Sequence, residues 1–114
     1  MTLVHLIEAL YPSLEGTIIT DEPFPCPLTM HFPDDGGEMV VSNWNGEQVW
    51  KCTGGCAGDE WKDGKQFIVQ AMGLGSLTAS HLFLQLTNLA DHEERVCYIE
   101  ENWPHWFTAG KVAP

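Results

Sequence analysis

Positive charge is scarce in this chain, and the first 50 of its 114 residues contain no lysine or arginine. Five basic residues in all stand against 16 aspartates and glutamates, which gives a formal net charge of −11. Nucleic-acid binding depends on lysine and arginine that neutralise phosphates, so direct binding of DNA or RNA is not expected. An anionic membrane surface would repel the chain for the same reason. The kind of partner that this charge attracts is a basic protein.

Long apolar runs are also missing, because no stretch approaches the ~18 uninterrupted apolar residues of a membrane-spanning helix. The N-terminus lacks a basic segment, and Glu8 interrupts its apolar residues, so a secretory signal is not expected. We therefore expect a cytoplasmic protein whose four cysteines are reduced thiols.

What the chain does contain is enough apolar material for a core. Hydrophobic residues make up 44% of it and include five tryptophans and five phenylalanines, which argues against wholesale disorder. Domains commonly have about 100–150 residues. We therefore expect a single domain over residues 1–114.

Two segments have the spacing of apolar residues that is typical of helices. Thr2 can cap a helix over 3–11, where leucine and isoleucine recur every three or four residues. Ser76 can cap a second helix over 77–90. The acidic run 91–94 would then lie at the C-terminal end of this helix, where carboxylates oppose the helix macrodipole. We therefore expect that run to be a loop or a docking feature.

The remaining regular segments have the composition of strands. Asn45-Gly46 supplies the positive φ angles of a type I′ turn and predicts a hairpin between strands 38–44 and 47–52. Other strands are expected at 16–21, 28–32, 66–72 and 95–100, with a glycine-rich loop over 53–65. This order predicts an α+β domain, with a mainly antiparallel sheet of five to six strands and two helices packed on one face.

The carboxylates of the first half and an aromatic segment near the C-terminus are the expected partner-binding residues. Small acidic inhibitors of nucleic-acid enzymes, such as phage antagonists and immunity proteins, have this size and charge. The segment 103–106 is broken by a proline and is expected to form an exposed apolar patch. The sequence thus favours a non-catalytic module that occupies a basic protein surface, needs no cofactor, and is a monomer or a homodimer. The residues assigned to this surface are Glu15, Asp21, Glu22, Asp34, Asp35, Glu38, Glu47, Trp103 and Trp106.

A glycine turn offers an alternative function and leaves open whether the protein is an enzyme. The stretch from Gln70 to Ser76, with Gly73 and Gly75, lies between an expected strand and an expected helix. It resembles the loop with which GCN5-related acetyltransferases hold the pyrophosphate of acetyl-CoA on backbone N–H groups. The resemblance implies an acyl-CoA-binding transferase fold, with these four residues at the cofactor. The simpler interpretation is that the glycines only end a strand and start a helix.

A structural zinc site is a further alternative. Cys26, His31, Cys52 and Cys56 could supply four ligands, because Zn²⁺ takes thiolate and imidazole in a tetrahedron. Three residues separate Cys52 from Cys56, whereas the usual zinc signature has two. Cysteines are also often buried without binding a metal.

Overall fold

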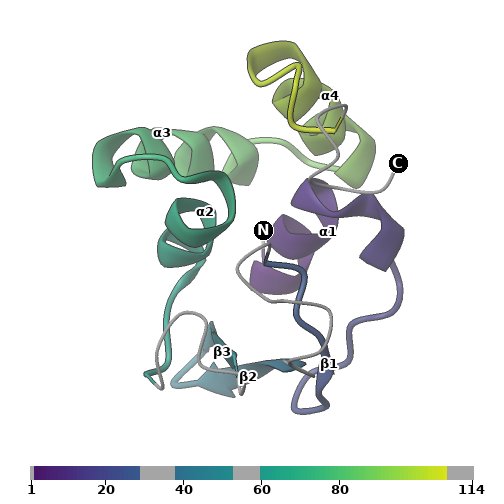
Figure 1. Cartoon of the computed structure of the whole chain (residues 1–114), viewed down its shortest axis with the longest axis vertical. Coiled ribbons are helices and arrows are strands. Elements are labelled where there is room, and N and C mark those ends of the chain that lie inside the picture. Colours follow the sequence, from purple (N-terminus) through teal and green to yellow (C-terminus); the bar gives the residue numbers. More distant parts are fainter. Residues whose placement is uncertain (1, 29–37, 53–59, 108–114) are drawn as a thin grey trace.

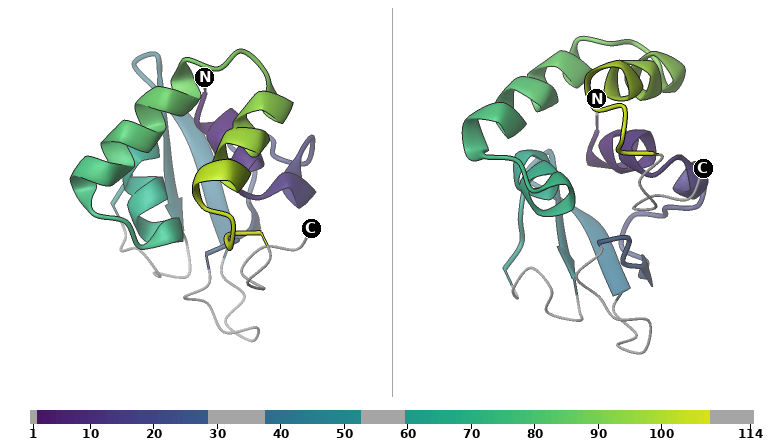
Figure 2. Two further views of the ribbon diagram at one scale, coloured as in Figure 1. Left: turned by 90° about the horizontal axis from the view of Figure 1, so that it is seen from above. Right: turned by 45° about the horizontal axis from the view of Figure 1, so that its top comes forward.

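The computed structural model describes residues 2–28, 38–52 and 60–107. These residues form four α-helices, one short 3-10 helix and a three-stranded antiparallel sheet (Figure 1). Helices α1 (Leu3–Leu10) and α2 (Gly64–Met72) lie next to the sheet, and α3 (Ser76–Thr87) and α4 (His92–Asn102) lie beyond them (Figure 2). The described elements therefore stack in three layers.

Helix α1 confirms the expected first helix. The Thr2 hydroxyl accepts a hydrogen bond from the His5 backbone N–H at 3.2 Å, and His5 Nδ1 accepts one from the Thr2 N–H at 3.4 Å. Its apolar stripe is fully buried against the rest of the core. Proline cannot continue a helix interior, so α1 gives way to the 3-10 helix η1 (Pro12–Leu14).

The expected hairpin is also confirmed, as β2 (Glu38–Trp44) and β3 (Glu47–Cys52). Asn45 and Gly46 have φ angles of 50° and 84°, which is the left-handed geometry that a type I′ turn needs. The inner face of the hairpin is buried, whereas its outer face is partly exposed. A two-residue strand, β1 (Phe24–Pro25), pairs with the other edge of β2.

The prediction of strands at 66–72 and 95–100 is wrong, because these segments belong to helices α2 and α4. Asp63 starts α2: its carboxylate accepts the Gln66 N–H at 2.9 Å, and the Gln66 side chain accepts the Asp63 N–H at 2.9 Å. This reciprocal cap satisfies the first donors of the helix and favours it over a strand despite the β-branched residues inside.

The other strand expectations also need correction. Residues 16–21 form turns, since the Thr17 N–H donates to the Leu14 carbonyl and Asp21 has a φ of 65°. The strand expected at 28–32 lies outside the described residues except for Leu28. The fold is α+β with four helices and a three-stranded sheet within the described residues, and not a sheet of five to six strands with two helices. The cause is that β-prone segments were incorporated into helices by their caps.

A row of four rings runs through the core and joins the layers; we call it the aromatic row. Trp50 of β3 meets Phe67 of α2 edge to face at 5.4 Å between ring centroids. Phe67 meets Tyr11 at 6.1 Å, and Tyr11 meets Trp106 at 5.7 Å. Both tryptophans also donate their indole N–H to a backbone carbonyl at 2.8 Å, that of Asp63 and that of Leu10 respectively. The row connects the hairpin to the C-terminal turn.

The described helices are short compared with a membrane-spanning helix. No single helix among the described residues is long and apolar enough to cross a membrane. Helices α2 and α3 reach that length and composition only together, and they are bent by 118° at the break between them.

Candidate functional site

Five carboxylates are placed near the junction of η1 and α4, and we call them the acidic cluster. The Glu8 carboxylate of α1 accepts the Gly16 N–H at 2.7 Å, which holds it beside the residue after Glu15. Glu15 Oε2 lies 2.6 Å from His92 Nε2, at the first residue of α4. The remaining members occupy the cap and first turn of α4. The cluster consists of Glu8, Glu15, Asp91, Glu93 and Glu94.

The first turn of α4 explains why so many carboxylates are tolerated there. The Asp91 carboxylate accepts the Glu94 N–H at 2.9 Å and caps the helix. Glu93 and Glu94 then lie at the positive end of the helix macrodipole, which stabilises them. The expectation that 91–94 is a loop is therefore wrong, since Asp91 caps α4 and the helix begins at His92. The spacing Asp-x-x-Glu, typical of a capping box, is the signal that identifies it.

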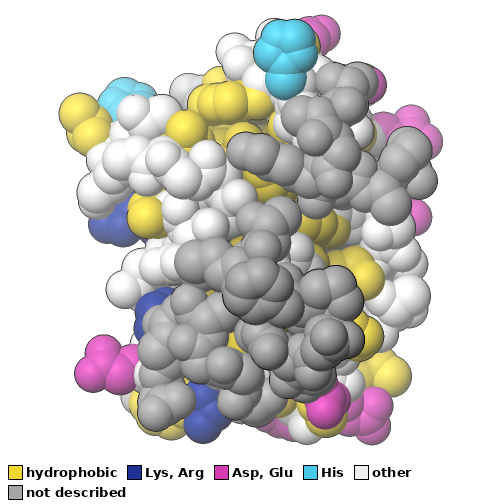
Figure 3. Space-filling model, in the orientation of Figure 1, with side chains coloured by type: hydrophobic (Ala, Val, Ile, Leu, Met, Phe, Trp, Pro, Cys, Tyr) yellow, Lys and Arg dark blue, Asp and Glu magenta, His cyan; other side chains and the backbone are white. Residues whose placement is uncertain are grey.

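Exposed lysine and arginine are missing from the two segments that carry the acidic cluster. Within the described residues 2–28 and 88–107 the one lysine or arginine is Arg95, and it is buried, with 7% of its surface exposed. Its guanidinium donates to the Leu86 carbonyl at 3.3 Å and to the Leu89 carbonyl at 2.9 Å, at the end of α3. Figure 3 shows acidic side chains along the upper right edge of the molecule, whereas the basic ones lie at the left and bottom, where further acidic side chains are also seen. The described lysines are Lys51, Lys62 and Lys65.

The other carboxylates assigned to the partner surface are spread over the sheet. Asp21 lies beside β2, where its N–H donates to the Val41 carbonyl at 2.7 Å and its carboxylate accepts from the Ser42 hydroxyl. Glu22 follows it, and Glu38 begins β2 opposite Pro25. Asp34 and Asp35 lie outside the described residues. The structure thus joins Glu15 to the carboxylates of α4, and it separates Glu38 from Glu47 by the length of the hairpin.

The aromatic segment near the C-terminus does not form the exposed patch that was expected. Trp106 is only 5% exposed and ends the aromatic row. Trp103 is half-buried and packs against the core. The Leu10 carbonyl explains this placement, because α1 leaves its last carbonyls without helical partners and the Trp106 indole N–H satisfies one of them. Proline in the segment shapes a turn that returns the chain to the core.

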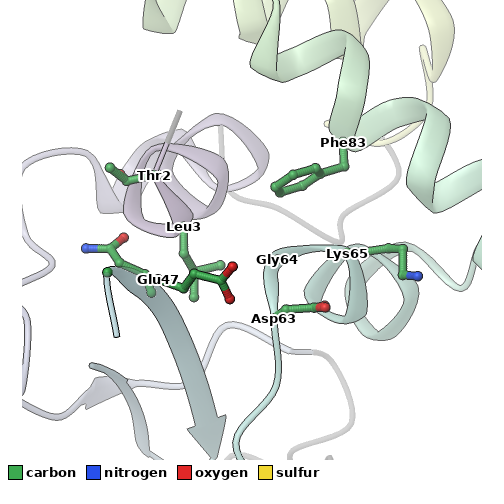
Figure 4. Close-up of a pocket in the computed structure, with 9 residues that line it drawn as sticks. Thr2, Leu3, Glu47, Asp63, Gly64, Lys65 and Phe83 are labelled. Atoms are coloured by element: carbon green, nitrogen blue, oxygen red, sulfur yellow. The ribbon is translucent and has the colours of Figure 1, made fainter. Parts of the chain in front are cut away.

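Glu47 lines an open cavity of about 380 Å³. Figure 4 shows its carboxylate between the start of α1 and the start of α2, with Phe83 reaching in from α3 and Lys65 pointing away. A Cβ at Gly64 would lie 2.6 Å from the Phe83 ring, so a glycine there allows α3 to approach. The lining mixes carboxylate, amide, ammonium and aromatic groups without selecting one class of ligand.

The glycine turn joins two helices. Gln70 lies in α2, Gly73 ends that helix with a φ of 69°, and Gly75 is the N-cap of α3. Ser76, expected as the cap, is the first residue of α3. Gln70 and Ser76 line a shallow cavity of about 360 Å³ together with Lys62 and Lys65. The strand that the acetyltransferase resemblance places before this loop is a helix, so the scaffold implied for the cofactor is missing.

Two of the four expected zinc ligands lie outside the residues that the structure describes. Cys26 is half-buried just after β1, and Cys52 is 1% exposed on the inner face of β3. His31 and Cys56 lie outside the described residues. In the part of the chain that the structure describes, no group of three or more His, Cys, Asp or Glu side chains could hold a metal ion.

Comparison with known proteins identifies no relative. No protein-family model matches the chain, and no match is found among curated proteins or solved structures. The acidic cluster, and the absence of exposed lysine and arginine from the described segments that carry it, are therefore the features on which a function can be based.

Proposed function

We propose that this protein is a small acidic binding module, without catalysis of its own, that docks onto a basic surface of a second protein. The acidic cluster is the observation that carries the proposal. Its five carboxylates come from α1, η1 and α4, and the described segments 2–28 and 88–107 expose no lysine or arginine beside them. A surface with one sign of charge attracts the opposite sign and accelerates its encounter.

The elements that carry the cluster suit it to this role. Asp91 and Glu93 stand on a capped helix, and Glu15 follows a 3-10 turn whose backbone is hydrogen-bonded to the chain before it. Carboxylates in fixed positions lose less conformational freedom on binding than carboxylates on a mobile loop. They can occupy the positions that phosphates take on a nucleic-acid-binding protein. The module would then inhibit its partner by competition.

The uneven distribution of the lysines gives the docking a direction. Lys51, Lys62 and Lys65 lie on β3 and at the start of α2. Exposed carboxylates such as Glu47 and Glu60 lie in the same region, so the lysines offset them there. A basic partner is therefore attracted more strongly to the acidic cluster, which favours one orientation over others. The proposal therefore predicts a defined interface and not general adhesion to any cation.

Capture of the partner from a lysate at two salt concentrations tests the proposal. The test variant is the double substitution Glu15→Lys and Glu93→Lys, and the matched control is Glu47→Lys and Glu60→Lys. All four side chains are exposed, and both variants change the net charge equally. We expect the wild type to retain a basic protein at low salt and to lose it at high salt. The test variant should lose the partner, and the control should keep it.

Two outcomes would contradict the proposal. If no basic protein is retained at low salt, the module has no such partner. If the control loses the partner as fully as the test variant does, the total charge matters and the acidic cluster does not define the interface.

A further inference from the structure

Helix α3 has apolar side chains on two opposite sides. The inner side packs against the core through Ala79, Leu82 and Leu86, which are at most 1% exposed. Leu77 and Leu84 point the other way and are 75% and 57% exposed. They are seven positions apart in the chain, so they lie on the same side of the helix, two turns apart. An ordinary surface helix has one such side.

The outer side of α3 lies within the longest uncharged stretch of the chain. Residues 66–90 contain no aspartate, glutamate, lysine or arginine, although the chain as a whole carries a net charge of −11. In Figure 3 hydrophobic side chains and a histidine gather at the upper left, over α3, apart from the acidic side chains of the upper right edge. Figure 1 shows α3 at the outer edge of the molecule, packed on α2. The neutral side of α3 is therefore open to a partner.

We propose that this side of α3 is a surface through which two copies of the chain associate. We call it the α3 face, and it consists of Leu77, Ser80, His81 and Leu84. An antiparallel pair of α3 helices about a two-fold axis places Leu77 of each copy against Leu84 of the other. Ser80 then lies beside His81 near the axis, and the small serine side chain allows the helices to approach closely.

The lack of charged residues on the α3 face favours a second copy of the chain over a basic protein as its partner. A basic protein gains no attraction from a face without carboxylates, and the acidic cluster offers it more. Two copies of this chain repel each other through their net charge wherever they meet, and the repulsion is smallest where the approaching surfaces are neutral. The α3 face is such a surface, and its two leucines supply apolar area to bury.

The size of the α3 face limits how tightly two copies of the chain can associate. A helix of 12 residues is about 18 Å long, so a single helix pair buries less than the roughly 800 Å² per partner of a standard interface. The association should therefore be weak and depend on concentration. Salt should strengthen it, because screening reduces the repulsion between two acidic chains. This is the opposite of the salt response expected for the basic partner, so the two proposals stand or fall separately.

Sedimentation velocity of the full chain, from about 1 μM to about 1 mM, covers the range of weak association. The test variant is Leu84→Glu, and the matched control is Ile19→Glu, because both side chains are 57% exposed and both substitutions add the same charge. We expect the wild type and Ile19→Glu to shift toward a dimer with concentration and with salt. Leu84→Glu should remain a monomer, and Leu77→Glu should behave in the same way.

Each alternative result overturns the inference. A wild type that stays monomeric over this range at high salt shows that the α3 face does not pair. A dimer that survives both leucine substitutions shows that another surface pairs. Circular dichroism of the variants shows whether the helices are intact, and the exposure of both leucines in the single chain makes loss of folding an unexpected result.

Discussion

The side built from α1, η1 and α4 and the side built from the hairpin, α2 and α3 share one core but differ in surface. The first exposes carboxylates and, in the described segments, no lysine or arginine. The second carries the described lysines, which lie among exposed carboxylates such as Glu47 and Glu60, and the neutral α3 face. Folding produces this separation, because Glu8 and Glu15 come from one end of the chain and Glu93 from the other. A net charge thus predicts a kind of partner, but it does not predict where on the molecule the carboxylates gather.

The substitution with the largest expected effect on stability tests whether the two sides fold as one unit. Phe67 is fully buried and lies at the centre of the aromatic row, between Trp50 of one side and Tyr11 of the other. Phe67→Ala should lower the free energy of unfolding by about 4 kcal/mol, through lost burial and the cavity left behind. Urea unfolding measures it, followed by far-ultraviolet circular dichroism and by tryptophan fluorescence.

The control for this variant is Leu84→Ala, which removes an exposed side chain and should change the free energy of unfolding by less than about 0.5 kcal/mol. Both probes should follow one transition in Phe67→Ala. Two separate transitions would show that the α1–η1–α4 side holds its structure without the hairpin side, and the shared core would then be an incorrect description.

The next effect concerns the buried arginine of the acidic side. Arg95 joins the two sides, since it stands on α4 and its guanidinium donates to carbonyls at the C-terminal end of α3. Arg95→Met keeps much of the packing but leaves those carbonyls without a charged donor, and should cost about 2 kcal/mol. Arg95→Lys keeps the charge and should cost less. Urea unfolding of both variants measures the difference, and equal losses would show that charge at this helix end contributes nothing.

Each side contains elements that the sequence predicted correctly and one helix that it predicted as a strand. Thr2, the leucine spacing and Pro12 specify α1 correctly, and Asn45-Gly46 specifies the hairpin. These signals are local, because each depends on the geometry of a few adjacent residues. Local signals remain valid whatever the rest of the chain does.

The errors occur where intrinsic preference and helix caps disagree. Phe67-Ile68-Val69 prefers a strand, but Asp63 and Gln66 cap a helix whose apolar side meets the sheet and α3. The segment 96–99 is similar, with Asp91 as its cap. Strand preference depends strongly on context, so packing of these segments in helical form outweighs it. Greater weight on the spacing Asp-x-x-Gln and Asp-x-x-Glu would have identified both helices.

The candidate site was predictable in kind but not in place. The scarcity of lysine and arginine indicated an acidic surface, and Glu15 belongs to the cluster that the structure shows. The contact between Glu15 and His92 joins residues 77 positions apart in the chain, and no local pattern predicts such a pair. Trp106 was misplaced for the same reason, because its partner is the Leu10 carbonyl at the far end of the sequence.

Two glycines on the hairpin–α2–α3 side should differ in how much stability is lost when each is replaced by alanine, and this effect is smaller than those above. A Cβ would meet nothing within 4 Å at Gly73 or at Gly75, but only Gly73 has a positive φ, of 69°. Gly73→Ala should therefore lower the free energy of unfolding by about 1 kcal/mol, whereas Gly75→Ala should be close to neutral. Thermal unfolding of the two variants measures this. Equal effects would mean that backbone conformation at the α2 end is not what requires the glycine.

The smallest expected effect on stability comes from a substitution at Tyr11, which lies at the junction of the two sides. Its hydroxyl is buried and has no hydrogen-bond partner among the described residues. Burial raises the pKa of Tyr11 well above its usual value, and the nearby charge of Cys26 adds to this shift. Tyr11→Phe removes an unsatisfied polar group and should raise the free energy of unfolding by about 0.5 kcal/mol at neutral pH.

The response to pH distinguishes this explanation from a simple change in packing. Above the unfolded-state pKa of about 10, the unfolded chain loses a proton that the native Tyr11 retains, so the stability of the wild type falls as the pH rises. Tyr11→Phe lacks this proton, and its advantage should therefore grow between neutral pH and about pH 11. Urea unfolding of both proteins across this range measures the difference. A constant difference would show that the hydroxyl ionises equally in both states and is not desolvated by the core that the two sides share.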